Sequence, residues 1–311
     1  MRVLVTGGDG FIGQYLVNNL LQRGDHVHVL DNNITSTPIL IHENLTRVKG
    51  DVCDILEILP DYSPNVIVHL ASVAIPKLYM EQPDLVIRPN VFGTHEVCKL
   101  AEKYSARIIF ASSSEVYGSI IDDSAIGTAI SESDSSISSL LSARTPYSTA
   151  KKMGEEIIRS FTQKGHSACS VRLFNVVGPN MDSAVIGYGR VIPNFVESIR
   201  ELRPLTIYGN GEQKRCFLWI EDAVTALVNL IDYGGELPDA INVGHPQQIS
   251  ILSLANKFQE FSNADVGIIF SPKLPDEPKH RCPDISLAIS MLNWRPTVDL
   301  DEIIYRVLDE G

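Results

Sequence analysis

The sequence predicts an α/β protein built on a doubly wound parallel β-sheet. Over the first 173 residues, short β-branched segments alternate with amphipathic helical segments. The first of these strands runs directly into three glycines, Gly7, Gly10 and Gly13, and a helical pattern follows them. After Leu173 the pattern changes, because Gly and Pro become frequent and the strands become short. Repeated βα units imply a parallel sheet covered by helices on both faces, and the change of pattern implies a second, smaller unit.

The predicted elements follow one another in regular order. Strands are predicted at Arg2–Thr6, His26–Leu30, Thr46–Val48, Val66–Leu70, Arg107–Ala111 and Ala168–Leu173. Long helices are predicted over Asn90–Tyr104 and Pro146–Gln163, and residues 119–142, rich in Ser and Ile, are predicted to form a long loop beside the active site. We expect a Rossmann-type domain over residues 1–173, with a return strand near 240–243, and a smaller α/β domain, mainly for substrate binding, over residues 174–311.

Composition argues against several classes of partner. The 311 residues are 44% hydrophobic and carry a formal net charge of −12, whereas a nucleic-acid surface needs clustered Lys and Arg. The five cysteines are scattered without Cys-x-x-Cys spacing, which argues against a metal centre or a disulfide framework and favours a reducing compartment. No apolar run approaches membrane-spanning length, and only one strand precedes the glycine turn, which leaves no room for a cleavable leader. We expect a cytoplasmic protein with no nucleic-acid, membrane or metal partner.

The glycine turn has the pattern of a dinucleotide site. Gly7 permits the tight turn after the strand, Gly10 lets the backbone approach a pyrophosphate, and Gly13 lets the helix pack closely on the sheet. The helix N-terminus then offers unpaired N–H groups and its positive dipole end to the phosphates. Asp31 ends the second strand, where a carboxylate accepts hydrogen bonds from ribose hydroxyls and repels a 2′-phosphate. Because Asn32 rather than an arginine follows Asp31, the sequence favours NAD over NADP.

A Tyr-x-x-x-Lys pair follows the dinucleotide site. Tyr147 and Lys151 are four residues apart and therefore lie on one face of a helix. A lysine ammonium beside a phenol lowers the pKa of the phenol, which makes Tyr147 a candidate base for a sugar hydroxyl while hydride leaves for a nicotinamide. Ser113, at the end of the fifth strand, is placed to orient the same hydroxyl, and Lys151 to hydrogen-bond the nicotinamide ribose.

Together these motifs resemble the extended short-chain dehydrogenase/reductase family, specifically its nucleotide-sugar epimerases, dehydratases and decarboxylases. The resemblance covers essentially the whole chain and includes Thr6–Gly13, Ser112–Gly118 and Arg172–Pro179. It implies a retained NAD, held by Gly7, Gly10, Phe11, Ile12, Gly13, Asp31, Asn32, Asp51, Val52, Leu70, Ala71, Ser72, Asn90, Tyr147 and Lys151. It also implies a homodimer, in which the helices near 90–104 and 146–163 pair with those of a second copy.

The same resemblance implies a nucleotide-diphosphate sugar as the substrate, with UDP as the expected nucleotide. Arginine suits a diphosphate because its planar guanidinium binds two oxygens at once. The implied substrate-binding residues are Lys77, Asn175, Arg190, Val191, Tyr208, Arg215 and Arg281.

Glu115 bears most directly on which reaction the chain carries out. The family shares oxidation of the sugar at C4 to a 4-keto intermediate. Dehydratases and uronate decarboxylases that resemble this sequence carry Glu at the position of Glu115, where it removes the C5 proton or lies near the departing carboxylate. Epimerases often carry a small or non-acidic residue there. A glutamate that merely caps its loop is the alternative interpretation.

The remaining motifs do not agree on the product. Ser114 departs from the Asp-Glu pair of deoxythymidine-diphosphoglucose dehydratases and matches the Ser-Glu of other dehydratases and of decarboxylases, whereas Thr145-Pro146-Tyr147 resembles the epimerase and dehydratase pattern. We predict a lyase, either a UDP-hexuronate decarboxylase or a nucleotide-sugar dehydratase, with Glu115 as its acid/base. The predicted catalytic set is Ser113, Ser114, Glu115, Tyr147 and Lys151. A 4-epimerase is the alternative, and a non-catalytic dinucleotide sensor is a more distant one.

Overall fold

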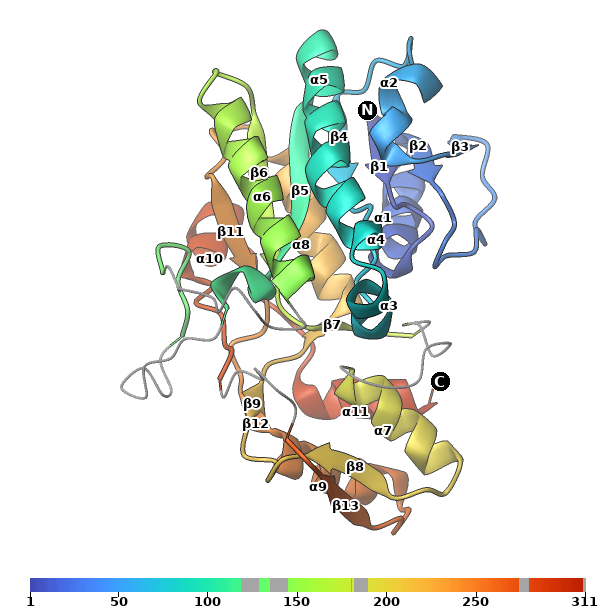
Figure 1. Cartoon of the computed structure of the whole chain (residues 1–311), viewed down its shortest axis with the longest axis vertical. Helices are drawn as coiled ribbons and strands as arrows, with labels where there is room; N and C mark the ends of the chain where they lie inside the picture. The colour runs from blue at the N-terminus through green and yellow to red at the C-terminus, as the bar shows by residue number, and fades with distance from the viewer. Residues whose placement is uncertain (119–128, 135–144, 180, 182–189, 274–279, 310–311) are drawn as a thin grey trace.

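The computed structural model describes residues 1–118, 129–134, 145–179, 181, 190–273 and 280–309. Within them, seven parallel strands form one sheet in the order β11-β6-β5-β4-β1-β2-β3 (Figure 1). The strands are β1 (Arg2–Thr6), β2 (His26–Asp31), β3 (Leu45–Lys49), β4 (Val66–His69), β5 (Arg107–Ser113), β6 (Ala168–Leu173) and β11 (Ala240–Val243). The strand order reverses beside β1, which is the place where ligands bind in doubly wound sheets.

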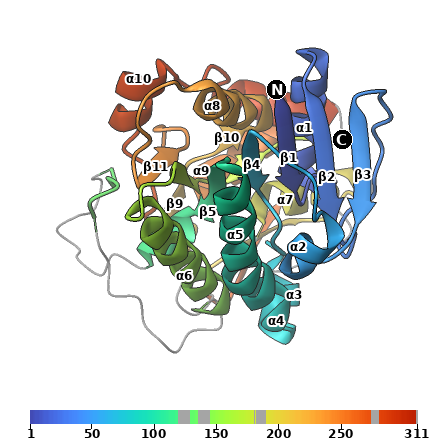
Figure 2. The same cartoon turned by 90° about the horizontal axis from the view of Figure 1, so that it is seen from above.

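Helices cover both faces of this sheet, as the view from above shows (Figure 2). One face carries α1 (Phe11–Gln22) and α8 (Ile220–Asp232), and the other carries α5 (Thr94–Tyr104) and α6 (Thr145–Thr162). Alternate residues of β1 serve the two cores: Val3 and Val5 belong to the first and Leu4 to the second. Strands buried on both faces need apolar residues at every position, which explains their continuous β-branched character. The predicted doubly wound α/β fold is confirmed.

One predicted helix differs from its expected form. The segment expected to be regular from Asn90 to Tyr104 begins instead with a π-helical turn, Arg88–Gly93, before α5 starts at Thr94. Two side chains there take backbone carbonyls as partners: Asn90 donates to the oxygen of Val86 at 2.8 Å, and Thr94 donates to that of Asn90 at 2.7 Å. Side chains that compete for backbone groups in this way loosen regular helical bonding.

The second half of the chain builds a smaller layer of short strands and helices at the lower end of Figure 1. There β8 (Leu205–Tyr208) pairs with β13 (Ile268–Ser271), and β9 (Lys214–Arg215) pairs with β12 (Ile249–Ser250). The helices α7 (Val191–Arg200) and α9 (Ile251–Ser262) pack against these strands, and α11 (Leu300–Asp309) packs on α9. The connecting pair β7 (Val176–Val177) and β10 (Leu218–Trp219) lies between this layer and the main sheet.

The remaining elements are short. They are α2 (Ile55–Ile58), α3 (Pro76–Glu81), α4 (Asp84–Ile87) and α10 (Ser286–Leu292), with 3-10 turns at Val52–Asp54 and Ser114–Tyr117. Of the loop predicted over residues 119–142, only residues 129–134 are described, and the rest of that prediction lies outside the described residues.

Candidate active site

A cavity of about 490 Å³ opens at the carboxyl edge of the main sheet. The glycine turn and the ends of β2, β4 and β5 form one side of it, and α7, β8 and residues 213–217 form the other. It therefore lies where the strand order reverses, and it receives side chains from both halves of the chain. Most of the residues predicted for the cofactor and the substrate line this one cavity.

The glycine turn has no room for side chains. A Cβ on Gly7, whose φ is +71°, would lie 2.7 Å from the backbone of Ala71, and a Cβ on Gly13 would lie 2.4 Å from the carbonyl oxygen of Gly7. Gly10 begins α1 without a side-chain cap, so the first N–H groups of the helix remain available to a ligand. The turn is thus the kind of cradle that a pyrophosphate requires, and NAD fits it.

Asp31 is held rigidly at the far end of this cradle. One carboxylate oxygen accepts hydrogen bonds from the Asn33 nitrogen at 2.8 Å and the Ser36 hydroxyl at 3.0 Å. The other accepts one from the Asp9 nitrogen at 3.0 Å. With 8% of its surface exposed, Asp31 lines the cavity together with Asn32. Such a carboxylate suits the adenosine ribose hydroxyls.

The remaining predicted cofactor residues divide into two groups. Those that line the cavity are Phe11, Ile12, Asp51, Val52, Leu70, Ala71 and Ser72. Asn90 does not: it is fully buried in the π-helical turn and donates to the Ser72 hydroxyl at 2.8 Å. Asn90 therefore supports the wall of the cavity from behind.

Ser113, Tyr147 and Lys151 lie together in the lining of the cavity. The Tyr147 hydroxyl is hydrogen-bonded to the side chain of Ser113. The Lys151 ammonium donates to the carbonyl oxygen of Ala111 at 2.6 Å and lies 5.8 Å from the centre of the Tyr147 ring. On the same ring, Tyr79 of α3 stacks with its centroid 5.2 Å away and its plane tilted by 21°. The phenol is thus held by contacts from three elements.

Burial dominates the ionisation of this pair. It raises the pKa of Tyr147 to about 12, although the hydrogen bond with Ser113 acts in the opposite direction. It also lowers the pKa of Lys151 to about 7, because a desolvated ammonium is disfavoured. The predicted lowering of the Tyr147 pKa by Lys151 is therefore wrong in this structure: the burial that weakens the charge of the lysine also disfavours the phenolate.

Glu115 forms an ion pair with Arg281 on the cavity wall next to this group. The distance from its Oε1 to the guanidinium Nη1 is 2.5 Å, and 5% of Arg281 and 25% of the Glu115 side chain are exposed. Arg281 also donates to the carbonyl oxygen of Gly118 at 3.3 Å. The Ser113 hydroxyl accepts from the Glu115 nitrogen at 3.2 Å and so caps the turn that carries the glutamate. Ser114 lines the same wall.

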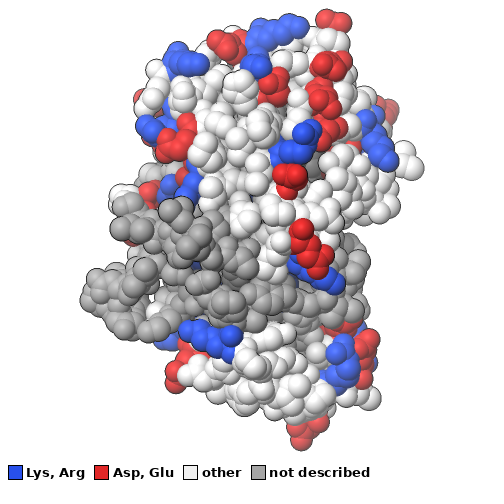
Figure 3. All heavy atoms as spheres, in the orientation of Figure 1, with Lys and Arg blue, Asp and Glu red and all other residues white. Residues whose placement is uncertain are grey.

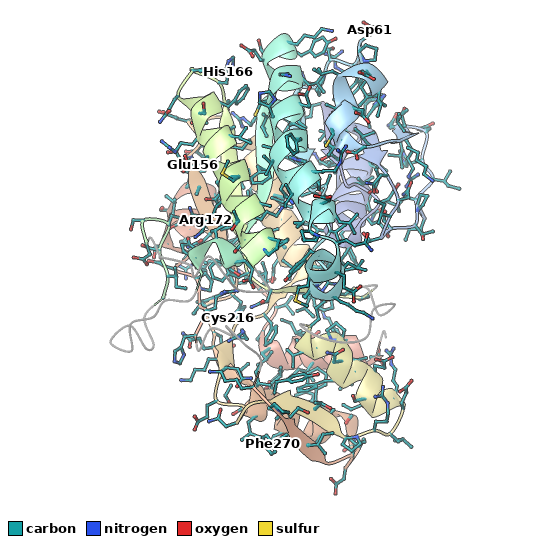
Figure 4. All side chains as sticks on the ribbon, in the orientation of Figure 1. Asp61, Glu156, His166, Arg172, Cys216 and Phe270 are labelled. Carbon is teal, nitrogen blue, oxygen red and sulfur yellow. The ribbon has the colours of Figure 1, made fainter. Side chains whose placement is uncertain are left out.

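The predicted substrate residues lie mainly on the opposite wall. Asn175, Arg190, Val191, Tyr208 and Arg215 line the cavity there. The amide of Asn175 donates to the carbonyl oxygen of Cys216 at 2.8 Å, and Arg190 donates to that of Ala74 at 3.1 Å. Figure 4 shows Cys216 in the region that joins the main sheet to the lower layer.

Lys77 is the exception among the predicted substrate residues. It is exposed on α3, and the cavity lining includes Pro76 and Tyr79 of this helix but not Lys77. A short helix exposes one side and buries the other, so the two neighbours point inward while the lysine faces solvent.

A protein-family model described as "NAD dependent epimerase/dehydratase family" matches residues 3–244. The chain belongs to the NAD-dependent epimerase/dehydratase family. The predicted resemblance and the predicted NAD cofactor are both confirmed by this membership.

Curated members of the family resemble the chain over nearly its whole length. UDP-glucuronic acid decarboxylase 2 of Arabidopsis thaliana is 34% identical over 308 residues, which are 96% of this chain and 66% of the relative. UDP-glucuronic acid decarboxylase 1 of Xenopus tropicalis is 34% identical over 307 residues, 97% of this chain and 70% of the relative. The chain thus spans about two thirds of the length of these relatives.

A solved structure of the family has the same fold. UDP-glucuronic acid 4-epimerase from Bacillus cereus, in complex with UDP-glucuronic acid and NAD, superposes with a TM-score of 0.86 at 26% identity and covers 100% of this chain and 98% of that one.

The remaining expectations concern surface charge, metal ligands and membrane-spanning helices. On the face shown in Figure 3, acidic and basic side chains lie interspersed. The described residues contain no cluster of three or more His, Cys, Asp or Glu placed to hold a metal ion. No helix among them is long and apolar enough to cross a membrane.

Two features of the site could not be predicted from the sequence. Tyr79 lies in a helix too short to show a period, so nothing marked it as a neighbour of the family's Tyr-x-x-x-Lys pair. The ion pair of Arg281 with Glu115 joins residues 166 positions apart. Both residues had been predicted for the site, but their direct contact depends on the tertiary fold.

Proposed function

We propose that the chain is a NAD-dependent UDP-hexuronate decarboxylase that acts through a 4-keto sugar. The observation that carries this proposal is the ion pair of Glu115 with Arg281 beside Ser113 and Tyr147. An epimerase only has to turn its 4-keto sugar over, whereas a lyase needs a proton carrier and a cation beside C5 and C6. The two relatives named above are UDP-glucuronic acid decarboxylases, which supports the same choice.

The first step is oxidation at C4. The hydroxyl of Ser113 orients the C4 hydroxyl, and the oxygen of Tyr147 receives its proton. Bound NAD supplies the acceptor for the C4 hydride, held by the glycine turn, Asp31 and Lys151. Because the pKa of Tyr147 is raised to about 12, its deprotonation depends on positive charge near the phenol once the site is loaded.

The second step uses Glu115 and Arg281, next to Ser113 on the same wall. A C4 ketone makes the hexuronate a β-keto acid, so the bond from C5 to the carboxylate carbon breaks with its electron pair delocalised onto the C4 oxygen. Arg281 binds the carboxylate before it leaves, and Glu115, protonated from solvent, donates to C5 the proton that takes the place of carbon dioxide. Tyr147 returns its proton to the C4 oxygen, and the bound cofactor would supply the reductant for C4, so the cycle has no net oxidation.

Asn175, Arg190, Val191, Tyr208 and Arg215 hold the nucleotide diphosphate on the facing wall. In this proposal residues 1–173 with the strand at 240–243 serve mainly the cofactor, and residues 174–311 serve mainly the substrate. We also propose a cytoplasmic homodimer. The five cysteines are all free thiols, as expected in a reducing compartment. The π-helical turn before α5 carries the exposed apolar residue Phe92, and the neighbouring helix α6 carries the exposed Met153.

The test is incubation with UDP-glucuronate and NAD, followed by mass spectrometry of the sugar nucleotide. We expect a product lighter by carbon dioxide. Glu115→Gln should lower the rate of carbon dioxide release by roughly 10²–10⁴-fold while C4 oxidation, followed by reduced-nicotinamide absorbance, persists. Glu156→Gln, an exposed glutamate of α6 labelled in Figure 4, is the matched control and should leave turnover unchanged.

Three outcomes would contradict the assignment. A product of unchanged mass with inverted C4 by NMR identifies an epimerase, and a product lighter by water from a UDP-hexose identifies a dehydratase. Full turnover by the Glu115→Gln variant removes the role of Glu115.

A further inference from the structure

A second carboxylate lies behind Asp31 at the adenosine end of the cavity. Asp9, between Gly8 and Gly10 of the glycine turn, is only 3% exposed. Its backbone nitrogen donates to Asp31 at 3.0 Å, and its carboxylate accepts from the Asn33 amide at 3.2 Å. The two acidic residues therefore belong to one hydrogen-bonded network at the place where the ribose binds.

Among the described residues, one guanidinium serves this network. The Nε of Arg47, on β3, lies 2.8 Å from the Asp9 carboxylate. Its Nη1 donates to the carbonyl oxygen of Leu40. A buried carboxylate and a guanidinium at this distance form a charge-assisted hydrogen bond, which is stronger than a neutral one. These two contacts orient the Arg47 side chain toward the glycine turn and the backbone at Leu40, and Arg47 does not line the cavity.

The charges of this network disfavour an additional phosphate. Asp9 and Asp31 contribute two negative charges and Arg47 contributes one positive charge, so the network as a whole is negative. A phosphate monoester on the ribose 2′-oxygen would add about −1.5 to −2 charges at neutral pH. Removal of the Asp9 charge would make the network neutral and would leave Arg47 without its carboxylate partner.

We propose that Asp9 is a specificity-determining residue that selects NAD over NADP by keeping Arg47 engaged and away from the ribose 2′-oxygen. Asp31 alone binds the hydroxyls of NAD, and Asp9 makes the exclusion of a 2′-phosphate strict. Arg47 is a latent phosphate-binding group. This inference concerns cofactor choice and does not depend on which sugar reaction follows.

The test measures dissociation constants of NAD and NADP by isothermal titration calorimetry with cofactor-free protein and no sugar present. We expect Asp9→Asn and Asp9→Ala each to lower the ratio of the NADP to the NAD dissociation constant roughly tenfold or more, the effect of one charged hydrogen bond. The double variant Asp9→Ala/Arg47→Met should recover most of the original ratio, because the phosphate-binding group is gone. Circular dichroism confirms that each variant is folded.

Asp25→Asn is the matched control. Asp25 is also a buried carboxylate, 4% exposed, and is paired with Arg23 at 2.5 Å, but it precedes β2 at the amino edge of the sheet. For Asp25→Asn, the ratio of the NADP to the NAD dissociation constant should equal that of the unmodified chain. The proposal is overturned if both Asp9 variants change the binding of NAD and of NADP by the same factor, because Asp9 would then only support the turn. It is also overturned if the double variant keeps the NADP affinity gained by Asp9→Ala.

Discussion

Replacement of Lys151 with methionine should stabilise the folded chain at neutral pH and lose that advantage at high pH. Lys151 is 2% exposed, and burial lowers its pKa from 10.5 to about 7. The unfolded chain therefore binds a proton that the folded chain releases between these two values. The stability of the folded chain consequently rises with pH through this window, and the penalty of the buried ammonium is fully present below about pH 7.

The magnitude follows from the two pKa values. At 1.36 kcal/mol per pH unit, the penalty is about 4 kcal/mol at pH 7 and about 1 kcal/mol at pH 10. Methionine is of similar length and carries no charge, so it removes this pH-dependent penalty. It also removes the 2.6 Å hydrogen bond to Ala111, which is worth about 0.5–1.5 kcal/mol for the neutral amine, and the pKa shift already contains what the charge adds. The variant should be more stable at pH 7 by about 2.5–3.5 kcal/mol and within about 1 kcal/mol of the unmodified chain at pH 10.

Urea unfolding of cofactor-free protein at pH 7, 8.5 and 10 measures this difference. The free-energy gap between the variant and the unmodified chain should change by about 3 kcal/mol over that range. Lys164→Met, at an exposed lysine just after α6, is the control and should show a gap that does not vary with pH. A gap for Lys151→Met that stays constant within about 1 kcal/mol from pH 7 to pH 10 would refute the argument that burial suppresses its charge.

Two further predictions concern the glycine turn and the assembly. Gly13→Ala places a Cβ 2.4 Å from the Gly7 carbonyl oxygen. It should therefore destabilise the chain by about 1–3 kcal/mol in thermal unfolding and weaken NAD binding in calorimetry. Gly234→Ala, whose Cβ meets nothing within 4 Å, is the control and should change neither. If α5 and α6 pair with a second copy, light scattering should give twice the 34.3 kDa chain mass. The double variant Phe92→Asp/Met153→Asp should reduce the measured mass to that of one chain. A single-chain mass for the unmodified protein contradicts the dimer.

The fold was predictable because its signals are local. Each strand of the main sheet is a short apolar run bounded by turn residues, and the observed strands differ from the expected ones by only one or two residues, as at Leu45 and Asp31. The departure at Arg88–Gly93 arises where side chains, not backbone periodicity, decide the hydrogen bonding. A hydrophobic pattern carries no information about that competition.

The membership of the site was also largely predictable, but its electrostatics were not. A motif shows that Tyr147 and Lys151 share a helix face, yet the direction of a pKa shift depends on how much water the finished fold excludes. Here burial is the largest cause of both pKa shifts, upward for Tyr147 and downward for Lys151. The partner of Arg47 could not be inferred either, because β3 and the glycine turn meet only through the sheet.

The position of the Arg281 guanidinium depends on the last strand of the sheet. Ile130 donates to the carbonyl oxygen of Cys282 and accepts from the nitrogen of Asp284, both at 2.8 Å, so Ile130 forms a parallel bridge with Pro283, two residues after the arginine. The amide of Asn242, on β11, donates to the carbonyl oxygens of Ile130 at 2.9 Å and Asp284 at 3.2 Å. Strand β11 therefore completes the sheet and anchors the segment that carries the cation. That segment lies far along the chain from the cofactor half, so the sheet fixes the position of Arg281 relative to that half, and the proposed lyase chemistry depends on this connection.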